Sequence, residues 1–150
     1  TAGHDSDTPE MLCVVTLRFP ELPDPPLCDL VRSGYFRSVL SLGLRAVRRL
    51  FNIVSWAEGI EQEILAGRPA VRLEGLAVLP SQQGQGIGSR ALQHWLSEMV
   101  DVQGLLALAT TQEERNLPFY RRLGFELVRD ALYAPGGFQS WFLLRSPVGR

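Results

Sequence analysis

The sequence predicts an α/β domain, an α+β sandwich in which helices flank a mixed, partly antiparallel β-sheet. Three observations predict it. The chain has 150 residues, 45% of them hydrophobic and 21% charged, which is the size and composition of one globular domain with a buried core. Apolar segments of strand length alternate with segments of helical periodicity. A short glycine-containing turn separates the last two apolar segments, which indicates an antiparallel pair. We therefore expect a single domain over residues 1–150.

The first half of the chain is predicted to hold one strand and two helices. Residues 11–19, MLCVVTLRF, are apolar and rich in β-branched side chains, which indicates a mostly buried strand. The proline-rich residues 20–29, PELPDPPLCD, are expected to form a connection. Over residues 35–65, apolar residues recur at three- and four-residue steps, which predicts two amphipathic helices with a break near Ser55–Gly59. The sequence GRP at 67–69 ends the second helix.

Strands and helices alternate in the second half. Residues 70–80, AVRLEGLAVLP, predict a strand in which Gly75 marks a bulge or a close backbone approach. The next strand is expected to be parallel and buried on both sides, because its apolar run is short and continuous. The remaining predicted elements are a helix over 88–100, this parallel strand over 104–110, a short helix over 117–124 that ends at Gly124, and two strands over 125–133 and 138–145.

Charge and composition restrict the partners. The formal net charge is −1, so nothing global favours nucleic acid or a membrane surface. No apolar run approaches the ~18 residues that a membrane span needs. Cys13 and Cys28 form no CxxC motif and no secretory segment precedes them, so we expect a reducing, cytoplasmic location. His4 and His94 are far apart, and we expect no metal site.

The stretch PSQQGQGIGSRAL, residues 80–92, places three glycines on a predicted turn between a strand and a helix. The amides of such a turn, together with the unpaired first-turn amides of the helix, form a cradle suited to phosphate. A P-loop would need Gly-Lys-Ser/Thr, and the chain has no lysine. A dinucleotide fingerprint would need GxGxxG, a spacing that is absent here. The alternative is a tight turn in which the glycines only permit a sharp backbone.

Two motifs in this order resemble the GNAT family of N-acetyltransferases. Gln83, Gly86 and Gly88 match the family's acyl-CoA pyrophosphate loop, Q/R-x-x-G-x-G/A. Further along, NLPFYRRLGF at 116–125 resembles the family's second signature, N-x-x-x-Y-x-x-x-G-F. The closing YAPGGFQSWFLLR is similar to the ending of a GNAT subgroup with extra helices before its fourth strand. The resemblance covers roughly residues 73–145 and implies a GNAT-like sheet.

The resemblance implies an enzyme that transfers acetyl from acetyl-CoA, its cosubstrate, to a primary amine of an unknown small molecule or peptide. Such a domain needs no metal, and a homodimer is common in the family. Only a short polar stretch, residues 1–10, precedes the first strand, so the family's N-terminal arm is expected to be missing, through truncation or a different acceptor side. The alternative function is a catalytically silent acetyl-CoA-binding or regulatory module. A nucleotide-binding domain is disfavoured by the glycine spacing and the missing lysine.

The resemblance also implies roles for particular residues. Tyr120 would donate its proton to the CoA sulfur, and Asn116 would hydrogen-bond the pantetheine arm. Glu74, or a chain of water molecules, would accept the proton of the amine. The pantetheine would contact the backbone of Leu76, Ala77 and Val78, and the pyrophosphate would be bound by Gln83, Gly84, Gln85, Gly86, Ile87, Gly88 and Ser89.

Structural interpretations of the same residues stay open. Tyr120 could be a packing residue, Glu74 a solvated edge residue, and the side chains of Leu76 and Val78 plain core. Arginines at 37, 45, 48 and 49 either meet an acidic acceptor or solubilise a helix face.

Overall fold

The computed structural model describes residues 11–22 and 43–149. Its helices and strands, in chain order, are β1 (Cys13–Arg18), α3 (Leu44–Leu65), β2 (Ala70–Val78), α4 (Ile87–Trp95), β3 (Leu106–Thr111), α5 (Leu117–Arg122), β4 (Glu126–Tyr133) and β5 (Phe138–Arg145). Short 3₁₀ turns at Pro80–Gln82 and Glu114–Asn116 and a π-helical turn at Leu96–Asp101 complete the list. The predictions for residues 1–10, Cys28 and the region from Tyr35 to 42, including Arg37, lie outside the described residues.

The strands form one five-stranded sheet in the order β1-β2-β3-β5-β4. Strands β2 and β3 are parallel, while β1–β2, β3–β5 and β4–β5 are antiparallel. The predicted mixed sheet and the final antiparallel pair are therefore confirmed. Within the described part of the chain, no helix is long and apolar enough to cross a membrane.

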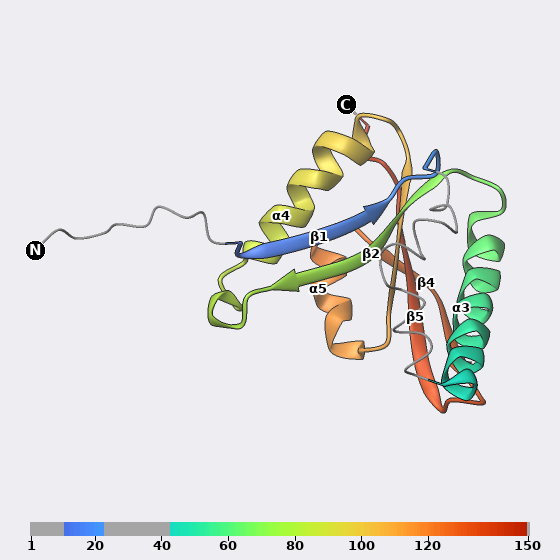
Figure 1. Cartoon of the computed structure of the whole chain (residues 1–150). Coiled ribbons are helices and arrows are strands. Elements are labelled where there is room, and N and C mark those ends of the chain that lie inside the picture. The colour runs from blue at the N-terminus through green and yellow to red at the C-terminus, as the bar shows by residue number, and fades with distance from the viewer. Residues whose placement is uncertain (1–10, 23–42, 150) are drawn as a thin grey trace, which may run out of the picture.

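The sheet opens between β2 and β3. Their pairing runs from Ala70 with Leu106 only as far as Leu73 with Ala109. Strand β2 continues to Val78 along β1, and β3 continues to Thr111 along β5, so the two strands diverge beyond their last pair. Figure 1 shows β1 and β2 running together away from the rest of the sheet. This opening leaves the β3-facing backbone groups of the end of β2 without a neighbouring strand among the described residues.

A β-bulge lies where the opening starts. In the β1–β2 register Thr16 faces Gly75 and Leu17 faces Leu73, so Glu74 is an extra residue on β2. The predicted irregularity at Gly75 is confirmed. Because a bulge shifts the alternation of side chains by one residue, Leu73 and Leu76 both pack against the same core cluster although they are three residues apart.

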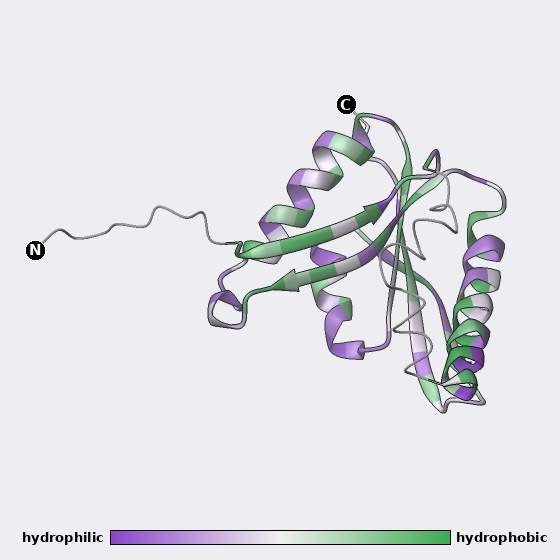
Figure 2. Ribbon diagram, in the orientation of Figure 1, coloured by the Kyte–Doolittle hydropathy of each residue, from purple (hydrophilic) through white to green (hydrophobic). Residues whose placement is uncertain are grey.

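Helices cover both faces of the sheet, with α3 on one side and α4 and α5 on the other (Figure 1). The larger core cluster packs α4 and α5 against β2, β3 and β5 and includes Val71, Leu92, Leu96, Ala109, Leu117, Tyr120 and Leu143. A smaller cluster on the α3 side contains Leu65, Ala70 and Leu108. Hydrophobic and hydrophilic residues alternate around α4 in Figure 2, as expected for a helix with one buried side.

The predicted break near Ser55–Gly59 is wrong, because α3 is continuous across it. A glycine inside a helix costs only about 1 kcal/mol relative to alanine, and no proline lies nearby. Residues on both sides of Gly59 pack against the sheet and stabilise the continuous helix. The Trp56 ring lies 5.1 Å from the Tyr133 ring and 6.2 Å from the Phe142 ring, and Ile60 is buried.

The predicted helix over 88–100 begins at Ile87 and changes to a π-helical turn at Leu96–Asp101. A buried ion pair follows. Both Asp101 carboxylate oxygens accept hydrogen bonds from Arg145, at 2.6 and 2.7 Å, and the two side chains are only 13% and 8% exposed. Arg145 Nε also donates to the Leu123 carbonyl at 3.0 Å. The pair ties together the ends of the α4 region, β5 and α5.

Candidate functional site

The three glycines of the turn between β2 and α4 serve different structural needs. Gly84 and Gly86 have φ angles of 79° and 74°, in the left-handed region that favours glycine. A Cβ at Gly88 would lie 3.1 Å from Val78 Cγ2 and 3.6 Å from Leu76 Cδ2, so Gly88 permits close packing of α4 on β2. Each glycine thus has a role that is independent of any ligand.

Three backbone amides at the start of α4 precede its first helical hydrogen bond. That bond runs from Arg90 N to the Gly86 carbonyl at 3.0 Å, so the amides of Ile87, Gly88 and Ser89 have no intrahelical acceptor. No side chain of the described residues caps this helix. The amides and the positive end of the helix dipole together favour an anion.

Two side chains hold the turn in place. Gln83 Nε2 donates to the Val78 carbonyl at 3.1 Å, which ties the turn back to β2. Arg90 Nη1 donates to the Gln85 carbonyl at 3.0 Å. Because both bonds fix the backbone on either side of Gly84, the direction of the amides depends on them.

The turn forms one wall of a groove of about 560 Å³. The end of β2 and one side of α5 form the other walls. The lining residues are Leu76, Val78, Gln82, Gln83, Gly84, Gly86, Ile87, Gly88, Ser89, Asn116, Phe119, Tyr120 and Arg122. Of the residues named from the sequence, Glu74, Ala77 and Gln85 do not line it. The structure therefore brings the glycine motif and the distant Asn116–Tyr120 motif to the same cavity.

Asn116 and Tyr120 are held in place by the end of β3 and by the core. Asn116 Nδ2 donates to Thr111 Oγ1 at 3.1 Å. The Tyr120 ring lies 5.2 Å from the Phe119 ring and 5.7 Å from the Phe125 ring, and the residue is 9% exposed. This burial raises the pKa of the Tyr120 phenol above its usual 10, so the hydroxyl keeps its proton at neutral pH. Tyr120 is at once a core residue and a groove residue.

Glu74 lies at the bulge and is turned toward the outer strand. Its Oε1 atom is 2.6 Å from Arg18 Nε on β1, and its side chain is 39% exposed. The predicted carboxylate is thus close to the strand opening but outside the groove that holds Tyr120.

Three groove residues were not predicted from the sequence, namely Gln82, Phe119 and Arg122. The last two follow Asn116 at three-residue steps, a spacing that places residues on one side of a helix. This spacing could have identified them. Arg122 supplies a guanidinium to the groove, and none of the described lining residues is a carboxylate, which favours an anionic ligand.

The predicted arginines of α3 lie elsewhere. Arg45, Arg48 and Arg49 line a second cavity, of about 590 Å³, between the start of α3 and the β4–β5 turn. All three are exposed. Among the described residues, no group of three or more His, Cys, Asp or Glu side chains is placed to hold a metal ion.

Comparisons with known proteins agree with this architecture. The model of the GNAT acetyltransferase domain matches residues 52–127, half of the chain. An agmatine N-acetyltransferase in its apo form is similar over 90% of this chain and 69% of its own, with a TM-score of 0.61 and 12% identity. At that identity the likeness shows the fold alone.

Two further structures match a shorter part of the chain. The ribosomal-protein-S18-alanine N-acetyltransferase of Escherichia coli matches with 19% identity and a TM-score of 0.46, over 54% of this chain and 56% of its own. An aminoglycoside 6'-N-acetyltransferase complexed with coenzyme A matches with 18% identity and a TM-score of 0.46, over 54% and 61%. The chain thus spans little more than half the length of either protein. From the domain match, this chain belongs to the GNAT acetyltransferase domain family.

Proposed function

We propose that this chain forms a single acyl-CoA N-acyltransferase-like domain, which transfers acetyl from acetyl-CoA to a primary amine of a small molecule or peptide. The groove at the β2–β3 opening is the main support. It joins the glycine turn to Asn116 and Tyr120, and its volume lies within the roughly 300–1,000 Å³ usual for small-molecule sites. Membership of the GNAT family supports the same reaction.

The groove offers a suitable donor for each part of acetyl-CoA. The amides from Gln83 to Ser89 would bind the pyrophosphate, with Arg122 adding a positive charge. Beyond the last β2–β3 pair, the backbone of Leu76, Ala77 and Val78 would pair with the pantetheine amides as a neighbouring strand does. Asn116 would hydrogen-bond the same arm.

The reaction requires two proton transfers, the formation of a carbon–nitrogen bond and the breaking of the carbon–sulfur bond. The amine nitrogen attacks the thioester carbonyl carbon, the carbon–sulfur bond breaks, and the Tyr120 phenol donates its proton to the departing sulfur. A thiolate with an ordinary pKa near 8.5 is a weaker base than a phenolate, but protonation as the bond breaks prevents charge from building on sulfur. Glu74 is the sequence-based candidate for the group that accepts the amine's proton.

Acetyl-CoA incubated with a panel of primary amines, with free thiol followed over time, tests the activity. At least one amine should release thiol, whereas CoA binding without thiol release on any amine would favour the silent module. A chain that neither binds CoA nor releases thiol would refute both functions.

The role of Tyr120 predicts a separate result. Tyr120→Phe should slow acetyl transfer about 100-fold, because general acid catalysis typically contributes 10²–10⁴-fold, and should leave CoA affinity unchanged. Tyr133→Phe is the matched control, since Tyr133 is equally buried but packs against Trp56 and Phe138, away from the groove. Single-turnover rates and urea unfolding should be measured for both variants. A Tyr120→Phe chain that is slow only because it unfolds would make Tyr120 a packing residue.

A further inference from the structure

A second carboxylate, that of Glu61 on α3, bridges the two strands that diverge. Arg72 Nε on β2 donates to Glu61 Oε2 at 2.9 Å. Thr110 Oγ1 on β3 donates to Glu61 Oε1 at 3.1 Å. The Glu61 side chain is only 15% exposed, so it lies between α3 and the sheet.

Its position coincides with the closed end of the β2–β3 opening. The last pair between these strands joins Leu73 to Ala109, and Thr110 is the next residue on β3. Thr110 and Thr111 point to opposite faces, as adjacent strand residues do. Thr110 contacts Glu61, while Thr111 accepts the hydrogen bond from Asn116 of the groove. Two adjacent residues of β3 therefore contact the Glu61 carboxylate on one face of the sheet and Asn116 of the groove on the other.

We propose that Glu61 binds the ammonium group of the acceptor amine and takes its proton. This inference rests on the proposed acetyl transfer and names the acceptor side of the same site. A carboxylate has about four lone-pair positions, and the hydrogen bonds from Arg72 and Thr110 use one on each Glu61 oxygen, so among the described contacts lone pairs remain for an ammonium donor. The substrate class is thus a cationic amine that approaches from the α3 face.

The proton balance is complete with the residues named. The ammonium N–H proton passes to Glu61, and the freed lone pair attacks the thioester carbon. As the carbon–sulfur bond breaks, the Tyr120 proton passes to sulfur, and the second nitrogen proton restores the phenol. The products are the acetamide, CoA thiol and a protonated Glu61 that returns its proton to water.

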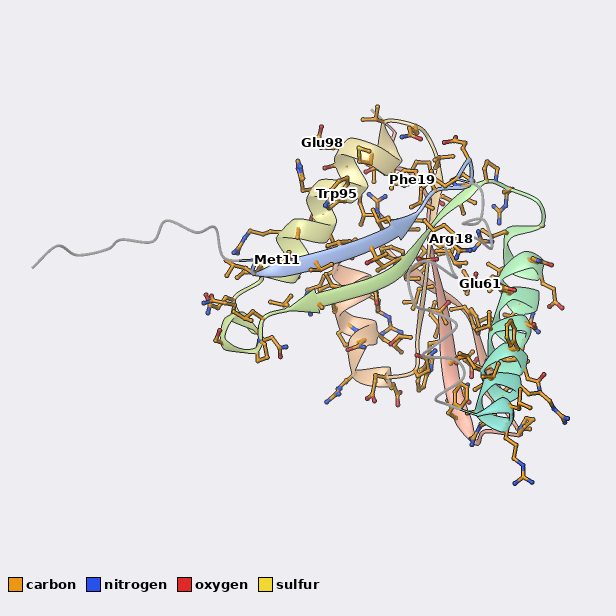
Figure 3. All side chains as sticks on the ribbon, in the orientation of Figure 1. Met11, Arg18, Phe19, Glu61, Trp95 and Glu98 are labelled. Atoms are coloured by element: carbon orange, nitrogen blue, oxygen red, sulfur yellow. The ribbon has the colours of Figure 1, made fainter. Side chains whose placement is uncertain are left out.

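Glu61 suits this role better than Glu74 because of the strands that each contacts. Glu74 pairs with Arg18 on the outer strand β1, whereas Glu61 contacts both strands of the opening. Figure 3 labels Arg18, which comes from β1, and Glu61, which comes from α3. Arg18 faces Arg72 in the β1–β2 register, so two carboxylates and two guanidinium groups from three elements, β1, β2 and α3, lie close together.

Glu61→Gln tests the proposal because glutamine can still accept from Arg72 and hydrogen-bond Thr110. The acceptors are benzylamine, or whichever panel amine the wild-type chain turns over fastest, and the corresponding O-substituted hydroxylamine, whose nitrogen is neutral at pH 7. For the amine, kcat/KM should fall about 100-fold, since its proton has no acceptor. For the hydroxylamine it should fall less than about threefold, and CoA affinity should not change.

Two controls separate this role from anchoring of the helix. Glu63→Gln changes a carboxylate two residues away that pairs with Arg129 at the surface, and it should leave both acceptors unaffected. Glu74→Gln tests the rival carboxylate. If Glu61→Gln does not fold, Glu61→Asp keeps the charge on a shorter side chain and should still slow the amine more than the hydroxylamine.

Each other outcome overturns the inference in a distinct way. An equal loss with both acceptors would mean that Glu61 only anchors α3. A loss confined to Glu74→Gln would assign the proton to Glu74. A wild-type chain that acetylates no amine of the panel would refute the proposed function, and the inference with it, whereas the first two results would leave acetyl transfer intact.

Discussion

Gly84 allows the turn to be tested without a steric clash. Its φ is 79°, and nothing lies within 4 Å of the position where a Cβ would be added. Gly84→Ala therefore adds only left-handed backbone strain, which costs roughly 1–2 kcal/mol. The free energy of unfolding should fall by about that amount, and CoA should bind more weakly because the turn amides move. Urea unfolding and a CoA titration measure both effects.

Gly149→Ala is the matched control, since its φ is outside the left-handed region and its added Cβ would also meet nothing within 4 Å. Gly149→Ala should change neither the free energy of unfolding nor the affinity for CoA. Unchanged stability and unchanged CoA affinity in Gly84→Ala would show that the turn does not need its left-handed residue.

At the scale of single residues, the sequence predicted the groove residues that belong to a short motif. Asn116 and Tyr120 were recognisable because NLPFYRRLGF resembles the GNAT signature N-x-x-x-Y-x-x-x-G-F, and both residues line the groove. Glu61 was not recognisable. Its partners Arg72 and Thr110 are 11 and 49 residues away, and only the sheet register brings them together.

Among the elements, the ends of helices depend on partners far away in the chain. The ion pair of Asp101 and Arg145 illustrates this, because it joins the turn after α4 to the end of β5. Hydrogen bonds from Arg145, and a further one from the amide of Val148, lower the pKa of the Asp101 carboxyl below its ordinary 3.8. The folded state therefore binds fewer protons at this site than the unfolded chain does.

Asp101→Ala should lower the free energy of unfolding by about 3 kcal/mol at pH 7, because it leaves the Arg145 guanidinium buried without a counter-charge. The sign of the pH dependence follows from the lowered pKa. The stabilisation is present above about pH 4 and is lost as the pH falls through the folded-state pKa, so the two chains should converge in acid. Urea unfolding between pH 3 and 7 measures this difference. A difference that stays constant with pH would contradict the ion-pair explanation.

Glu63→Gln again serves as the control. Its partner Arg129 and Glu63 itself are 45% and 66% exposed, so the free energy of unfolding should change by less than about 1 kcal/mol.

Element type could be predicted more reliably than element length. Apolar runs and turn residues located every described strand, and Gly124, with a φ of 83°, ends α5 as predicted. The continuity of α3 could not be predicted from Gly59 and its neighbours, because it depends on Trp56 packing against β4 and β5. The opening between β2 and β3 does not follow from any local pattern, because the pairing of these strands depends on residues more than 30 positions apart.

At the scale of the whole molecule, the sheet of the described residues has two segments, β1–β2 and β3–β5–β4, joined by four residue pairs from Ala70–Leu106 to Leu73–Ala109. A ligand in the groove would contact both segments, and binding only to the folded state stabilises it. At 100 times its Kd, CoA should add about 2.7 kcal/mol, which is a rise in Tm of roughly 5–10 °C for a domain of this size. Hydrogen exchange should slow at the amides of 87–89 and along α5. NAD is the control, because it has a pyrophosphate but no pantetheine arm. An equal shift with NAD would favour a nucleotide site over a CoA site, and protection confined to the glycine turn would mean that the ligand does not extend along the opening to Tyr120.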